Sequence, residues 1–173
     1  MARRERDNEP AVISEFDENV ISINRSAKVV KGGKNMSFGA LVVVGNRKGR
    51  VGYGYGKANE VSDAIRKGSE AAHKNLVTIP MNGDTIPHEI ECKFDGARVL
   101  LRPASSGTGL IAGGAVRAIL ELGGVKDVLA KSLGASNAAN VAKATFKAIE
   151  GLRSRAQVYG RRGIEIKDAV ENN

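Results

Sequence analysis

The apolar residues in the first half of the chain change their period once, near residue 59. Before this point they form the alternating or short apolar segments that are typical of strands, separated by turns rich in glycine and asparagine. The expected strands cover residues 20–30, 36–45 and 50–57. After it, the apolar and small residues fall on one helical face: Val61, Ile65, Gly68, Ala72 and Leu76. Asn59 is the expected N-cap of this helix, with Ser62 as the alternative.

The second half of the chain mixes short strands with helices. Its expected elements are, in order, strands over 86–94 and 98–102, a helix over 115–122, a strand over 126–132 and a helix over 137–152. Asp95-Gly96 is a strong hairpin signal between the first two strands. Gly123-Gly124 is expected to close the first helix, and Asn137 is expected to cap the second.

Turn residues and changes in composition divide the chain into four segments, with a boundary in the turn-rich stretch 80–84. The expected organisation is a flexible arm over 1–17, a first domain over 18–80, a second domain over 81–152 and a basic tail over 153–173. The fold class is α+β, with two small domains. The first is a three-stranded antiparallel sheet plus a helix, and the second is a compact α/β sandwich.

The charge of the chain points to a polyanionic partner. The 173 residues carry a formal net charge of +8, which favours RNA, DNA or an acidic membrane surface. No apolar run approaches the roughly 18 residues that a membrane span needs, and the N-terminus has no apolar segment typical of a secretory signal. The one cysteine, Cys92, excludes an internal disulfide and fits a cytoplasmic protein. A nucleic acid is therefore the expected partner, and no membrane.

The sequence contains no complete motif for catalysis, for metal binding or for cofactor binding. His73, His88 and Cys92 lack the spacing of a zinc site. Gly56-Lys57 resembles the end of a phosphate-binding loop, but Val51 stands where the first glycine is required and Ala58 where Ser or Thr is required. No nucleophile, base and acid form a recognisable set. The chain is therefore expected to be no enzyme and to have no cofactor and no metal.

Cations gather in the predicted turns of the first domain. No Asp or Glu occurs between Asn19 and Asn59, and charge of one sign would repel itself in isolation, which favours phosphate contacts over solvation. Glycines leave the backbone free to approach phosphate or ribose. The two basic turns lie at opposite ends of a meander, although long side chains and strand twist allow a shared face. The candidate RNA-binding residues are Arg25, Lys28, Lys31, Gly32, Gly33, Lys34, Asn35, Arg47, Lys48, Arg50, Gly52, Tyr53, Tyr55 and Lys57.

Two further features have more than one interpretation. Tyr53 and Tyr55 share one face of a strand and either stack on unpaired bases or cover the helix as part of the core, with the core interpretation favoured. The glycine-rich loop over 105–114 leads into a helix N-terminus, which attracts anions. This loop holds an RNA phosphate or a carboxylate of a partner protein, or is simply a tight turn over the core.

Several long motifs in the right order resemble the family of bacterial small-subunit ribosomal protein five, from about Asn19 to Leu152. They are Lys28-Val29-Val30-Lys31-Gly32-Gly33-Lys34, Gly49-Arg50-Val51-Gly52-Tyr53-Gly54-Tyr55-Gly56-Lys57-Ala58, Arg102-Pro103-Ala104-Ser105, Gly107-Thr108-Gly109, Ile111-Ala112-Gly113-Gly114 and Val128-Leu129-Ala130-Lys131. The arm before Asn19 and the tail after Leu152 match the family only loosely.

The resemblance implies a structural, RNA-binding component of the small ribosomal subunit. Its first domain would be related to double-stranded-RNA-binding domains. The family binds ribosomal RNA near the decoding region, contacts ribosomal proteins four and eight, and lies beside the entry channel for messenger RNA. Its first hairpin lies near the spectinomycin site, and its contact with protein four influences decoding accuracy. By similarity, that contact involves Gly107, Thr108, Gly109, Gly113, Gly114 and Arg117.

Two alternative functions, each with a different partner, compete with that of a ribosomal component. A nucleotide-binding kinase would use the 105–114 loop for ATP, although no obvious carboxylate for Mg²⁺ accompanies it. A free RNA chaperone would share the basic surface but would not travel with small subunits. A homo-oligomer is not expected.

Overall fold

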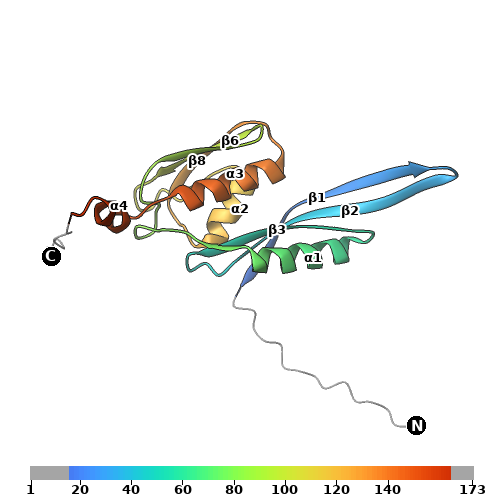
Figure 1. The fold of residues 1–173 in the computed structure, drawn as a ribbon, viewed down its shortest axis with the longest axis horizontal. Helices are drawn as coiled ribbons and strands as arrows, with labels where there is room; N and C mark the ends of the chain where they lie inside the picture. The colour runs from blue at the N-terminus through green and yellow to red at the C-terminus, as the bar shows by residue number, and fades with distance from the viewer. Residues whose placement is uncertain (1–15, 165–173) are drawn as a thin grey trace, which may run out of the picture.

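The structure is a computed structural model that describes residues 16–164 (Figure 1). The first half contains β1 (Asp17–Val30), β2 (Gly33–Gly45), β3 (Arg50–Ala58), α1 (Val61–Lys74) and β4 (Leu76–Thr78). The second half contains β5 (Ile90–Phe94), β6 (Ala97–Pro103), β7 (Leu110–Ile111), α2 (Gly114–Gly123), β8 (Val128–Gly134), α3 (Ala138–Gly151) and α4 (Arg155–Arg161). The two sheets have the strand orders β1-β2-β3-β4 and β5-β6-β8-β7, and β7 pairs with β8 in parallel.

The predicted α+β class, with an antiparallel sheet and helix followed by a second sheet with helices, is confirmed. The first sheet was predicted with one strand too few, because β4 pairs with the start of β3. The short elements β7 and α4 were also missed. The flexible N-terminal segment expected over 1–17 extends too far, because Asp17 already pairs with Gly45 in β1 and β2. Residues 1–15 of that segment and residues 165–173 of the expected basic tail lie outside the described part of the chain.

The caps of the helices agree with the sequence in two cases of three. Asn137 caps α3, where its Oδ1 accepts a hydrogen bond from the backbone N–H of Ala139 at 3.0 Å. Gly124 closes α2 in the left-handed conformation, as expected from its sequence. The prediction of Asn59 or Ser62 as the cap of α1 is wrong, because Glu60 occupies the N-cap without a side-chain hydrogen bond.

We expect Asn137→Ala to lower the free energy of unfolding by about 1 kcal/mol, because an N-cap side chain satisfies a backbone N–H that has no helical partner. Chemical denaturation of the full chain measures this loss. Ser62→Ala is the matched control: Ser62 is exposed in the first turn of α1 and is not its cap, so we expect a change within about 0.5 kcal/mol. Equal losses in the two variants would contradict the assignment of the caps.

The first sheet is covered on both faces at residues 40–44 of β2. On one face, Ala40, Val42 and Val44 of β2 pack against α1 in a small apolar cluster. On the other, Leu41 and Val43 join the main core, which includes residues of α2 and α3. This arrangement explains why 41–44 is a continuous apolar run, since each strand residue meets a buried face. The two halves of the chain therefore share one core.

Helix α1 lies very close to β3 because the strand presents glycines to it. A Cβ atom on Gly52, Gly54 or Gly56 would overlap a backbone carbonyl oxygen of α1. All three glycines are buried, and Gly68 on the helix is buried against Val42 from the neighbouring strand. The alternating glycines in this segment thus serve close packing of a helix on a sheet.

The turn over residues 46–49, called the docking turn below, joins the two halves through backbone hydrogen bonds. The N–H groups of Arg47 and Gly49 donate to the carbonyl oxygens of Leu122 and Gly123, both at 2.8 Å. A helix leaves its last four carbonyls without helical partners. In α2, the chain after the helix satisfies two of them and the docking turn satisfies the other two. The first half of the protein therefore completes a helix of the second.

Candidate nucleic-acid interface

Strands β1 and β2 extend beyond β3 and form a two-stranded hairpin over residues 25–37, called the arm below. Beyond Phe38, which pairs with Ala58 at the end of β3, β2 pairs with β1 alone. The arm projects away from the rest of the molecule (Figure 1). Across it, the hydroxyls of Ser26 and Ser37 lie 2.9 Å apart in a hydrogen bond that supports the strand register.

Seven of the candidate RNA-binding residues lie on the arm, and all seven are exposed: Arg25, Lys28, Lys31, Gly32, Gly33, Lys34 and Asn35. Residues opposite each other in an antiparallel pair share a face, so the pairs Val29–Lys34 and Lys28–Asn35 define the two faces of the arm. Arg25 and Lys34 lie on one face, Lys28 lies on the other, and Lys31 lies in the turn. The positive charge therefore surrounds the arm.

The tip of the arm depends on glycine. Gly32 has a φ of +92°, a conformation that other residues rarely adopt. Nothing lies within 4 Å of the position that a Cβ atom would take on Gly32 or Gly33. The backbone of the tip is therefore open to a close approach by another molecule.

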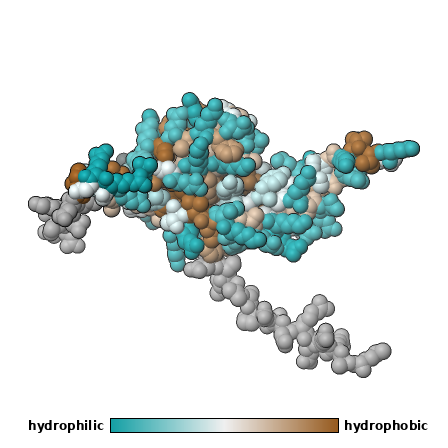
Figure 2. All heavy atoms as spheres, viewed as in Figure 1, coloured by the Kyte–Doolittle hydropathy of each residue, from teal (hydrophilic) through white to brown (hydrophobic). Residues whose placement is uncertain are grey.

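Apolar side chains accompany the cations on the arm. Val29 is 73% exposed, and Met36 is 44% exposed on the same face. Figure 2 shows a small apolar cluster near the end of the arm, followed by a hydrophilic tip. Exposed apolar groups beside cations suit ribose and base surfaces next to phosphates.

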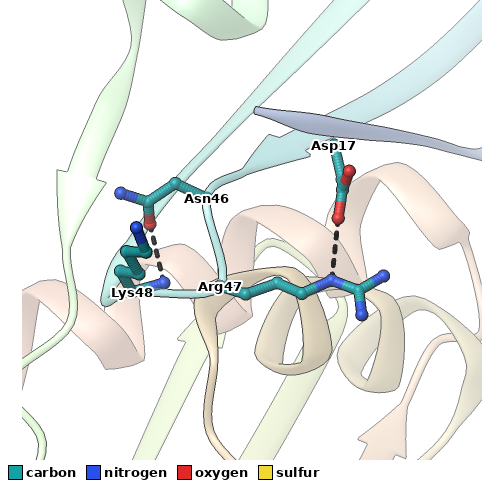
Figure 3. A network of polar contacts seen from close by, with 4 residues as sticks. All are labelled: Asp17, Asn46, Arg47 and Lys48. Atoms are coloured by element: carbon teal, nitrogen blue, oxygen red, sulfur yellow. Dashed lines mark hydrogen bonds and ion pairs between the residues drawn. The ribbon is translucent and has the colours of Figure 1, made fainter. Parts of the chain in front are cut away.

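The second basic turn is far from the arm. Arg47, Lys48 and Arg50 are exposed, but they follow the other end of β2, which is about 40 Å from the tip at the usual rise per strand residue. The two basic turns do not form one patch. The Oδ1 atom of Asn46 accepts a hydrogen bond from the backbone N–H of Lys48, and Arg47 forms a 2.8 Å ion pair with Asp17 (Figure 3). The same Oδ1 atom also accepts a hydrogen bond from the backbone N–H of Arg50. These contacts hold the docking turn in one conformation against α2.

The four candidates on β3 have different environments. The structure contradicts an RNA contact for Gly52, which is buried beneath α1. Tyr53 is half-buried, and its ring packs against Phe146 of α3 with centroids 4.5 Å apart, so it belongs to a core but does not, as the sequence had suggested, cover α1. Tyr55 is 53% exposed at the base of the arm, and Lys57 is exposed beside it.

The candidate partner-protein residues lie in a loop and in the first turn of α2. Gly107, Thr108, Gly113, Gly114 and Arg117 are exposed, and Gly109 is half-buried. The loop is ordered by one hydrogen bond within it and one to Asp127, which precedes β8. Thr108 Oγ1 donates to the carbonyl of Ser105 at 2.7 Å, and the N–H of Gly109 donates to Asp127 Oδ1 at 2.8 Å.

Three residues that position these surfaces were missed from the sequence. Asn46 fixes the docking turn, buried Asp127 fixes the 107–109 loop, and His88 contacts the chain just before α4. The Asn-x-x-Gly form of the turn signalled a role for Asn46. For Asp127 and His88, no local sequence signal identifies the distant group that each one binds.

The described residues form neither a metal site nor a membrane-spanning helix. No group of three or more His, Cys, Asp or Glu side chains within 16–164 is arranged to hold a metal ion. In the same range, no helix has the length and apolar character needed to cross a membrane. Cys92 is half-buried in β5 against the main core, as expected for a small apolar residue.

A hairpin that carries cations on both faces is typical of proteins that bind nucleic acids. The family described as ribosomal protein S5, N-terminal domain, matches residues 16–80, and the one described as ribosomal protein S5, C-terminal domain, matches residues 92–162. The chain is 58% identical over 151 residues to small ribosomal subunit protein uS5 of Protochlamydia amoebophila, which covers 87% of this chain and 90% of the relative. It is 57% identical over 154 residues to the protein of the same name from Treponema denticola, which covers 89% of each.

The chain belongs to the ribosomal protein S5 family. The family resemblance in the sequence is thereby confirmed. Membership also confirms the prediction of a ribosomal protein that acts in translation and is not an enzyme.

Proposed function

We propose that the chain is a structural component of the small ribosomal subunit, and that its arm binds small-subunit ribosomal RNA. The observation that carries the proposal is the distribution of charge on the arm. Cations lie on both faces and at the tip, and no acidic residue occurs between Asn19 and Asn59. A hairpin that is positive all around suits insertion between phosphate backbones better than contact with a single flat surface.

The finer assignments of the family belong to the same proposal. The arm binds RNA near the decoding region and the spectinomycin site, and the protein lies beside the entry channel for messenger RNA. The exposed arm, its open glycine tip and the exposed Tyr55 and Lys57 at its base support an RNA contact, and the place of that contact rests on the family resemblance.

The segment over residues 107–117 contacts ribosomal protein four in this proposal, and through that contact supports decoding accuracy; protein eight is a second neighbour. Gly107, Gly113 and Gly114 have open space around the position of a Cβ atom, and Arg117 is exposed on α2. An exposed loop with little side-chain bulk allows a partner protein to approach its backbone, while Asp127 keeps the loop in one conformation.

We expect Lys31→Glu/Lys34→Glu in the full chain to weaken binding to purified small-subunit ribosomal RNA by about 10-fold or more. Each lost phosphate contact lowers the slope of log affinity against log salt by about 0.7 to 0.9, so two contacts remove about 1.4 to 1.8. Filter binding at several salt concentrations measures both quantities. An unchanged affinity and slope would sink the assignment of the arm.

Lys67→Glu/Lys74→Glu is the matched control for net charge. Both lysines are exposed on α1, away from the tip of the arm, so the pair changes the total charge by the same amount without touching the arm. A loss of affinity as large as that of the arm variant would show that only overall charge matters, and would contradict a specific role for the arm.

A further inference from the structure

Helix α4 is a short element that its own chain caps at both ends but covers only in part, since Val158 and Tyr159 are half-buried and its other residues are exposed. At its start, Gln157 N–H donates to Ser154 Oγ at 3.3 Å and Ser154 N–H donates to Gln157 Oε1 at 3.1 Å, which is a complete capping box. At its end, Ile164 N–H donates to the carbonyl of Tyr159 at 3.2 Å, with Gly163 at a φ of +65°. None of its residues is buried.

These local signals matter because a helix of this length is unstable alone. Nucleation is unfavourable, and isolated helices shorter than about 12 residues are marginal in water. Most helices in proteins are stabilised by packing of an apolar face, and within the described chain no residue of α4 is fully buried. A helix with two caps and no fully buried residue is therefore suited to stabilisation by another molecule.

The charge around α4 identifies the chemistry of that molecule. Residues 151–164 contain four arginines and no acidic residue: Arg153, Arg155, Arg161 and Arg162. Three of these arginines line a groove of about 630 Å³ between α4 and the segment 81–88, and no acidic side chain lines it. Tyr159 lies in the same groove, with the guanidinium of Arg155 5.2 Å from the centre of its ring.

One wall of this groove is fixed to the body of the protein by His88. The backbone N–H of Arg153 donates to Nε2 of His88 at 3.1 Å. Nδ1 of His88 lies 2.9 Å from the backbone carbonyl oxygen of Glu89. A neutral ring with its proton on Nδ1 makes both hydrogen bonds. The backbone before α4 is therefore anchored, so that the arginines start from a defined position.

We propose that the groove between α4 and residues 81–88, called the α4 groove, binds an RNA phosphate backbone. Arginine guanidinium groups suit phosphate because they donate paired hydrogen bonds. The ring of Tyr159 offers a surface for a ribose or an unpaired base beside them. RNA fits better than an acidic peptide, because guanidinium groups and an aromatic ring together match both parts of a nucleotide.

The α4 groove is a second RNA contact, separate from the arm, and the inference rests on the proposed function. Figure 1 places α4 and the arm at opposite ends of the molecule. Binding at two distant sites would fix the orientation of the protein on folded RNA, which a single hairpin contact does not do. Because the sites are far apart, their contributions to affinity should add.

The experiment compares Arg155→Gln/Arg162→Gln with Lys67→Gln/Lys74→Gln in the full chain, using purified small-subunit ribosomal RNA. Both pairs remove two positive charges from exposed positions. We expect the arginine pair to weaken binding by about three- to tenfold and to lower the salt slope by about 1.4 to 1.8. The lysine pair should change both quantities much less.

Hydroxyl-radical footprints on the RNA separate this inference from the proposed function. The Arg155→Gln/Arg162→Gln variant should fail to protect one set of nucleotides. It should still protect the different set that the Lys31→Glu/Lys34→Glu variant leaves unprotected. An effect of the arginine pair with none from the arm variant would overturn the role of the arm alone. Unchanged RNA binding by the arginine pair would overturn the α4 groove as an RNA site. If that pair then impaired joining of the protein to subunits reconstituted with the other proteins, the groove would instead hold an acidic protein segment.

Discussion

Gly54→Ala should lower the free energy of unfolding by about 3 kcal/mol or more, although it adds a single methyl group. The new Cβ atom would overlap the carbonyl oxygen of Gly68 and lie 2.5 Å from the backbone nitrogen of Ala72. Both neighbours are backbone atoms of α1, so relief requires the whole helix to move away from the sheet. Overpacking of this kind typically costs about 1 to 3 kcal/mol, and more where the backbone must shift.

Chemical denaturation of the full chain measures this loss, and Gly33→Ala provides the control. Gly33 also lies in the first sheet and has a negative φ, but nothing lies within 4 Å of its Cβ position. We expect a change within about 0.5 kcal/mol at that site. Similar stability of the two variants would show that α1 does not pack on β3 as closely as described.

Gly124→Ala should be about as destabilising, for two reasons that can be separated. Gly124 has a φ of +88°, which costs about 1 to 2 kcal/mol for a residue with a Cβ atom. The Cβ atom would also overlap the carbonyl oxygen of Arg47 in the docking turn. Moving that turn lengthens the hydrogen bonds to Leu122 and Gly123, so we expect a total loss of about 3 kcal/mol or more.

Gly107→Ala isolates the first of these two contributions. Gly107 has the same φ of +88°, but its Cβ position has open space around it. Gly107→Ala should therefore lower the free energy of unfolding of the protein by only about 1 to 2 kcal/mol, as measured by chemical denaturation. If Gly124→Ala cost no more than Gly107→Ala, the docking turn would not hold the two halves together.

The main strands and helices were predictable because their patterns are local. Alternation, apolar runs and the change of period near residue 59 are set by which side chains face a core, and hairpin signals such as Asp95-Gly96 act within a few residues. Short elements lack this information. Leu76 continued the helical pattern of α1, yet it begins β4, because pairing with β3 is a tertiary contact.

Helix α4 was missed although its cap is visible in the sequence. Ser154 and Gln157 have the spacing of a capping box, but no periodic apolar residues follow them. Sequence reasoning identifies a helix mainly by its buried face, and α4 has none. The charge of the segment indicated only a basic tail.

The candidate interface was predictable where it depends on exposed charge alone. The residues of the arm are exposed whatever packs elsewhere, so their cations and glycines identified a surface directly. Gly52 and Tyr53 required knowledge of α1 and Phe146, which pack on opposite faces of β3. The docking turn likewise has a basic sequence, but its backbone role depends on α2, which lies about 70 residues further along the chain.

The shared core has a consequence for the order in which the protein is made. Synthesis proceeds from the N-terminus, so the first sheet and α1 leave the ribosome before the second half exists. The face that carries Leu41 and Val43 is buried only when Val116, Ile119 and the remainder of the core are present. Until then, the nascent chain exposes an apolar sheet face, and its final structure forms only after most of the polypeptide has been translated.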